Sequence, residues 1–106
     1  MTAFEGDART IRAELARRIE AVDRHCDSLR TGEIADELET IRKAAAANGI
    51  RSAVVVIHAI DTILSRGERG SRVHTGLAIL RDAVACDRDD APACDTFAAA
   101  CSLRLG

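Results

Sequence analysis

The stretch from Ile50 to Leu64 is the most apolar run in the chain and lies near its middle. Three of its polar residues, Arg51, His58 and Thr62, recur at helical spacings and form one narrow stripe, which Ser65 extends. Ser52 and Asp61 are the other polar residues of the run. All of its other positions are Ala, Val, Ile or Leu. An apolar surface this wide must be covered from several sides. The run therefore predicts a helix at the centre of a helical bundle, and we expect Ile60 to be buried and His58 exposed.

A β-strand over residues 53–60 is the alternative, because Val-Val-Val-Ile is β-branched. The run does not alternate, however, and it continues apolar at helical spacing. The chain also has 20 alanines, two phenylalanines and no Trp or Tyr among 106 residues. Alanine is the best helix former, whereas strands favour aromatic residues. These features predict an all-α fold, a single domain over residues 1–106.

A first helix is expected after residues 1–6, which we expect to fray, with Asp7 as its cap. Its apolar residues recur every three or four positions: Ile11, Leu15, Ile19, Val22, Cys26 and Leu29. This stripe predicts one helix as far as Leu29. Gly32, which can adopt a left-handed conformation, is expected to end it.

The remaining helices have clear boundary signals. A second is expected over about residues 33–47, with Ile34, Leu38, Ile41 and Ala45 inward, and Asn48-Gly49 stops it. Ser71 is expected to cap a fourth helix, and Asp90 a fifth with Pro92 in its first turn. The inner face expected for the fifth is Cys94, Phe97, Ala98, Cys101 and Leu105. Because the connections are short, the prediction is an antiparallel bundle of four to five helices.

The charge balance excludes several classes of partner. The net charge is -2, from 15 basic and 17 acidic residues, so no basic surface steers the chain toward nucleic acid or an anionic membrane. No apolar run approaches the ~20 residues that span a bilayer. The N-terminus lacks the basic start and apolar core of a signal peptide. We expect a cytoplasmic protein without a membrane partner, and a homodimer is compatible with the sequence.

Four cysteines, at positions 26, 86, 94 and 101, include no C-x-x-C pair. Since the chain has a core and no export signal, we expect buried, reduced thiols. The other donors of a metal site would be His25, His58 and His74. Adjacent residues such as His25 and Cys26 point about 100° apart on a helix, and the paired spacings of structural zinc sites are missing. We therefore expect no metal and no cofactor.

His58 has Asp61 and Thr62 three and four residues further along, on its side of the helix. A carboxylate beside a histidine is the arrangement that orients a general base. The simpler interpretation is that these residues are the solvated stripe of a helix that is otherwise buried. No nucleophile or anion-binding motif accompanies them, so we do not expect an enzyme.

Residues 45–52 resemble the turn of a helix-turn-helix motif, with a small residue four positions before Gly49 and an apolar residue after it. Base edges are read by Arg, Asn, Gln and similar side chains. Here the positions facing the groove would be Ala53, Val54, Val56 and Ile57. Those side chains offer no hydrogen bonds, so a small DNA-binding regulator is the alternative rather than the leading hypothesis.

Residues 39–69 resemble the central helical hairpin of bacterial histidine phosphotransfer domains, whose motif is H-x-L-K-G followed by small residues and a later glycine. Ile41 falls on the motif leucine, Arg42 on the lysine and Gly49 on the later glycine. Glu39 stands where the family has its phosphorylated histidine, and Lys43 replaces the motif glycine. The resemblance implies a helical bundle of two-component signalling that has lost its phosphorylatable group.

The leading functional hypothesis is a non-enzymatic, regulatory interaction module. The resemblance implies that Glu39, Arg42 and Lys43 form its interaction face, and that the partner is the receiver domain of a response regulator. Because Ile34, Leu38 and Ile41 point inward, Glu39 and Arg42 are expected to lie together on an exposed face.

Overall fold

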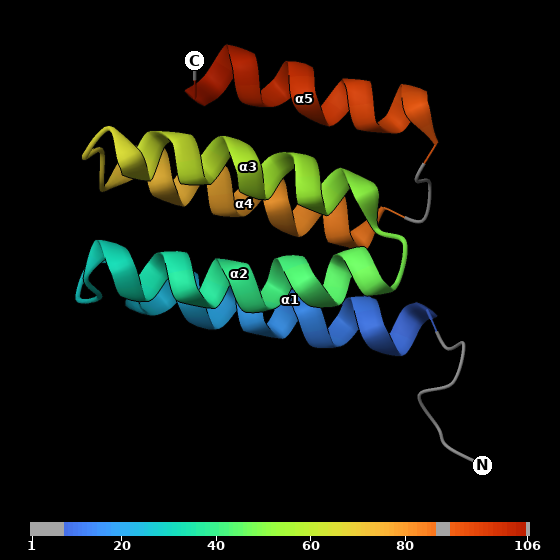
Figure 1. Cartoon of the computed structure of the whole chain (residues 1–106), viewed down its shortest axis with the longest axis horizontal. Coiled ribbons are helices and arrows are strands. Elements are labelled where there is room, and N and C mark those ends of the chain that lie inside the picture. Colours follow the sequence, from blue (N-terminus) through green and yellow to red (C-terminus); the bar gives the residue numbers. More distant parts are fainter. Residues whose placement is uncertain (1–7, 87–89, 106) are drawn as a thin grey trace.

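The computed structural model describes residues 8–86 and 90–105. These residues form five α-helices and no strand, so the chain is an all-α bundle, as predicted (Figure 1). The helices are α1 (Ala8–His25), α2 (Thr31–Ala47), α3 (Arg51–Ser65), α4 (Ser71–Ala85) and α5 (Ala91–Leu105). The predicted fraying of residues 1–6 and the cap at Asp7 lie outside the described residues.

Successive helices run in opposite directions and stack into a slab of 44 × 30 × 17 Å (Figure 1). The first four helices form a bundle in which α3 packs on α2 and α4, and α1 packs on α4 and α2. Helix α5 lies along the outer side of α3 and α4. Among the described helices, none combines the length and the apolar character needed to cross a membrane.

Helix α3 is the centre of the core, as its sequence predicts. Val56, Ile57 and Ile60 are completely buried, whereas His58 is exposed. The rest of the predicted polar stripe is exposed as well: Arg51, Thr62 and Ser65. The strand alternative is therefore wrong, and the packing of three other helices around α3 explains why so many apolar side chains occur in one segment.

The end of the first helix differs from the prediction. Helix α1 stops at His25 rather than Leu29, and a turn follows in which the amides of Ser28 and Leu29 both donate to the His25 carbonyl. Gly32 does not end a helix, because it lies in the first turn of α2. There the Glu33 carboxylate accepts a hydrogen bond from the Arg30 amide at 2.8 Å, which caps α2.

The other boundaries follow the sequence more closely. Asn48 ends α2, and Gly49 adopts a φ of 73°, which suits a residue without a Cβ. Asp90 caps α5, since its carboxylate accepts from the Ala93 amide at 3.0 Å. Ser71 is not a cap: it is the first residue of α4, and Gly70 precedes the helix with a φ of 75°.

Arginine side chains cap the carboxyl ends of three helices. Arg12 donates to the carbonyls of Val84, at 2.8 Å, and of Cys86 at the end of α4. Arg69 donates to two carbonyls that follow α1, and Arg72 donates to the carbonyl of Leu105 in α5. A guanidinium offers several donors in a rigid fork and complements the negative end of a helix dipole. This use explains in part why 14 of the 15 basic residues are arginines.

Helix α4 approaches α3 closely at Gly76. A Cβ built on this residue would lie 2.8 Å from Cγ1 of Ile60 and 3.5 Å from Cδ1 of Leu105. Glycine therefore lets α3, α4 and α5 meet at one point, and any larger residue would push against the most buried helix.

Candidate functional site

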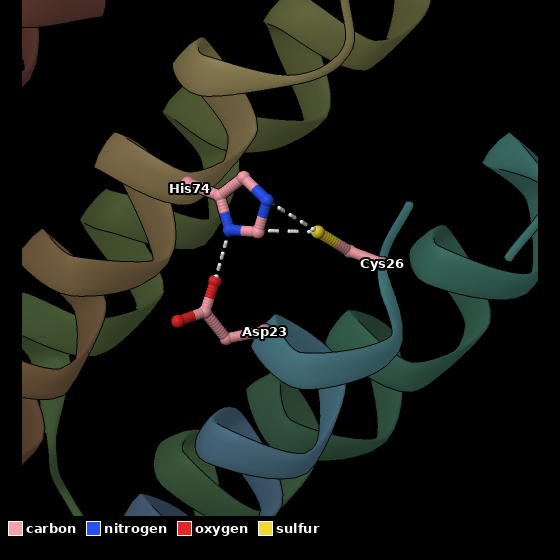
Figure 2. Close-up of side chains that lie close together, drawn as sticks. All are labelled: Asp23, Cys26 and His74. Atoms are coloured by element: carbon pink, nitrogen blue, oxygen red, sulfur yellow. Dashed lines mark hydrogen bonds and ion pairs between the residues drawn. The ribbon is translucent and has the colours of Figure 1, made fainter. Parts of the chain in front are cut away.

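Asp23 of α1 and Cys26, in the turn that follows α1, face His74 of α4 (Figure 2). Nδ1 of His74 lies 2.5 Å from Oδ1 of Asp23, and Nε2 lies 3.4 Å from Sγ of Cys26. Oδ1 of Asp27 is 3.3 Å from the same Nε2. One imidazole thus connects two carboxylates and a thiol.

The fold explains how these residues meet. Asp23 lies in the last turn of α1, and Cys26 and Asp27 follow three and four residues later in the turn after that helix, so neither adjacent side chain is held at helical spacing. Because α1 and α4 are antiparallel neighbours, the carboxyl end of α1 lies beside the first turn of α4, which carries His74. Arg69, just before α4, donates to the carbonyls of Cys26 at 2.5 Å and Leu29 at 2.7 Å. These bonds fix the backbone under the cluster.

The electrostatics of the cluster differ from its inner to its outer side. Cys26 is 1% exposed, and burial, followed by the nearby charges of Asp27 and Asp23, raises the pKa of its thiol. The pKa of His74 is also raised, chiefly because its imidazolium form donates to Asp23. The side chain of His74 is 39% exposed and that of Asp27 is 76% exposed, so the cluster opens to solvent on one side.

A thiol, an imidazole and a carboxylate in this order also form the arrangement that activates a cysteine nucleophile. That chemistry requires a thiolate that a substrate can approach. Here Sγ of Cys26 is covered by protein and burial favours its neutral form. The same groups are instead well placed to hold the two helices together or to bind a cation.

A second polar cluster lies on the α2–α3 face and contains most of the residues predicted from the sequence. The Glu39 carboxylate accepts two hydrogen bonds from Arg42, at 2.8 and 2.6 Å, and this pairing lowers the pKa of Glu39. Both side chains are half-exposed, and Lys43 is exposed beside them. Glu39 and Arg42 therefore share an accessible face, as expected from the inward direction of the α2 stripe.

The groove between α2 and α3 contains a shallow hollow of ≈ 440 Å³. Its lining is Thr31, Gly32, Ala35, Asp36, Glu39, Asp61, Leu64 and Ser65. Asp61 is partly covered there, and desolvation raises its pKa, while the charge of His58 opposes that rise. The structure thus brings Asp61 near Glu39, although the sequence assigned them to two separate clusters.

Only two side chains of the predicted polar group of α3 interact with each other, and the third, that of Thr62, does not join them. His58 and Asp61 interact through their charges. Thr62 does not act on the imidazole, because its hydroxyl donates to the backbone carbonyl of His58 at 3.0 Å. No hydrogen bond in the described residues orients His58 as a general base.

The burial of the four cysteines is less uniform than predicted. All four thiols are free; Cys26 and Cys101 are buried, whereas Cys86 and Cys94 are half-buried. Cys26 and His74 were candidate metal donors in the sequence, but nothing there pairs them with each other or with Asp23 and Asp27. Their pairing joins residues 48 to 51 positions apart, which no local spacing reveals.

Comparisons of the chain with protein-family models, with curated proteins and with solved structures find no match.

Proposed function

We propose that this protein is a non-enzymatic helical interaction module that binds a partner protein through the α2–α3 face. The observation that carries the proposal is the Glu39–Arg42 pair, which is fixed by two hydrogen bonds beside a solvent-open hollow. A charged pair held in one conformation loses little side-chain entropy when a partner binds. The hollow is wide and shallow, which suits a protein surface better than a small molecule.

The proposed partner is the receiver domain of a response regulator. In the phosphotransfer family that residues 39–69 resemble, an exposed imidazole accepts the phosphoryl group and a basic residue one turn later stabilises its charge. This chain keeps a basic residue at Arg42, with Lys43 beside it. Glu39 places a permanent negative charge where the phosphorylated histidine would stand. The chain would therefore dock on a receiver domain and block it without accepting phosphate.

The test is a binding titration against purified receiver domains from the same organism, each with and without phosphate. We expect Glu39→Lys to weaken binding at least about tenfold, because a central charged contact is reversed. Glu14→Lys is the matched control, since Glu14 pairs with Arg17 at the same spacing on α1. Equal loss in both variants would contradict the proposed face.

Phosphate transfer is tested in the same experiment with a labelled receiver domain. We expect no label on this chain. Label that maps to any of its histidines would contradict the inactive hypothesis, and absence of binding to every receiver domain would remove the family resemblance as a guide to the partner.

DNA binding gains no support from the packing of α3. Three of the four side chains that would face the major groove, Ala53, Val56 and Ile57, are completely buried. The fourth, Val54, is half-buried against the core. Base readout by α3 would therefore require the bundle to open, so we do not propose it.

A further inference from the structure

We propose that Cys26, Asp27 and His74 form a binding site for a single zinc ion, in which Asp23 orients the imidazole. This inference is independent of the α2–α3 face, and it departs from the sequence-based expectation of no metal. It depends on four side chains, from the end of α1, the turn after it and α4, which converge without any shared sequence motif. Figure 2 shows three of them, Asp23, Cys26 and His74.

The first argument is the separation of the donor atoms. Nε2 of His74 is 3.4 Å from Sγ of Cys26 and 3.3 Å from Oδ1 of Asp27, and Sγ is 3.8 Å from that oxygen. Zinc bonds of about 2.0–2.3 Å place tetrahedral ligand atoms roughly 3.3–3.6 Å apart. Because Sγ also lies 3.7 Å from Nδ1, the imidazole has to turn before the Nε2 lone pair points between Sγ and Oδ1, and an ion can then sit between the three atoms.

The second argument is the partner of the other imidazole nitrogen. Asp23 lies 2.5 Å from Nδ1, so the neutral ring carries its proton there and donates it to the carboxylate. That tautomer leaves the lone pair on Nε2, which lies near Asp27 and is the ring nitrogen nearer to Sγ of Cys26, at 3.4 Å against 3.7 Å for Nδ1. Histidine ligands of metals almost always donate their second nitrogen to a carboxylate or carbonyl in this way.

The third argument is the charge and chemistry of the donor set. A thiolate and an imidazole favour zinc and other transition metals over hard cations such as Mg²⁺, and zinc also accepts a carboxylate ligand. On binding, the S–H proton of Cys26 leaves for solvent as the zinc–sulfur bond forms, so the thiolate and the Asp27 carboxylate together balance the two positive charges. Arg69, held on the Cys26 carbonyl, opposes only in part the burial and the carboxylate charges that raise the pKa of this thiol.

The site is covered on one side and open to solvent on the other. Cys26 forms its inner wall at 1% exposure, and Asp27 forms its outer edge at 76%. An ion can thus enter from solvent, and a water molecule can take the fourth position. Bound zinc would link the carboxyl end of α1 to the first turn of α4.

The experiment is a titration of the full, reduced chain with Co²⁺, a coloured substitute for zinc, followed by competition with Zn²⁺. We expect one equivalent to bind, with a thiolate-to-cobalt absorption band that zinc abolishes. His74→Gln should remove the band, and Asp23→Asn should weaken binding about 10–100-fold, the usual effect of losing a partner of a ligand. Asp27→Asn should weaken binding more than Asp23→Asn does.

The control is Cys86→Ser/Cys94→Ser, which removes the two less buried thiols and should leave the band unchanged. Because Cys26→Ser changes a buried residue, its circular dichroism must first show a folded helical protein. His74→Gln, at a side chain that is 39% exposed, gives the same test without that risk. Absence of the thiolate band in the wild type, or its survival in His74→Gln, would overturn the proposal and leave a hydrogen-bonded clasp between the helices.

Discussion

Helices α3 and α5 have the same length, 15 residues, but very different surroundings. Helix α3 contacts α2, α4 and α5 and buries seven residues, whereas α5 contacts only α3 and α4 and buries three. Leu103 of α5 is 86% exposed. Since a short helix depends on tertiary packing for its stability, the two helices should differ in their opening free energies.

The largest expected effect is at the centre of α3. Ile60→Ala should lower the free energy of unfolding by ~2–5 kcal/mol, because it leaves a cavity at a side chain with 0% exposure. The control His58→Gln, on the exposed stripe of the same helix, should change stability by under ~0.5 kcal/mol. Urea denaturation measures both. A larger loss in the histidine variant would show that the stripe is not a solvated surface.

A smaller loss is expected at the inner face of α5. Cys101→Ala removes a side chain that is 5% exposed and should destabilise the protein by about 1–2 kcal/mol. Native-state hydrogen exchange should show faster opening of α5 amides while α3 amides stay protected. Cys94→Ala, at a half-buried thiol, should cost less. Equal loss of protection in α3 and α5 would mean that the two helices unfold as one unit.

The contact that joins α3 and α5 to α4 gives the third test. Gly76→Ala should lower stability by about 1 kcal/mol, because the strain of overpacking against Ile60 exceeds the gain in helix propensity. Gly32→Ala is the matched control, since it lies in α2 with nothing within 4 Å of an added Cβ. It should raise the thermal midpoint slightly. If both variants were stabilised, the helices would have room to separate at Gly76.

The smallest effect concerns the polar edge of α3. Burial raises the pKa of Asp61 in the folded state, so folding favours its neutral form. That contribution is present below the ordinary pKa and is lost as pH rises through the raised pKa. The stability of Asp61→Asn relative to wild type should therefore increase as the pH rises from about 3 to about 7. Thermal melts across this range measure the gain, with Asp95→Asn on exposed α5 as the baseline.

The fold was largely predictable because the inward stripes are regular. The α2 residues Ile34, Leu38, Ile41 and Ala45 are all completely buried, as are Val73, Leu77, Leu80 and Val84 of α4. Helix α5 was less predictable: Cys101 and Leu105 are buried, but Cys94, Phe97 and Ala98 are half-buried. Only two helices cover α5, so a stripe on it does not imply full burial.

The end of α1 shows a different limit. Its apolar pattern continues through Cys26 and Leu29, because both side chains pack on the core even though the helix has already ended. The Glu33 cap and the carbonyls held by Arg69 decide that boundary. The Glu33 cap is local, but the Arg69 bonds join segments 40 to 43 residues apart in the chain, beside the site where His74 meets Asp23. Periodicity predicts which side of a helix faces inward, but not which residues of two helices meet.

Helix α1 packs more extensively on α4 than on α2, and Arg12 reaches a carbonyl 72 residues further along the chain. During synthesis on the ribosome, α1 therefore emerges long before its main partner. Apolar surface on the α1–α2 hairpin therefore stays uncovered until α4 has been translated. A nascent chain stopped after α3 should accordingly be a better substrate for chaperones and proteases than one that includes α4.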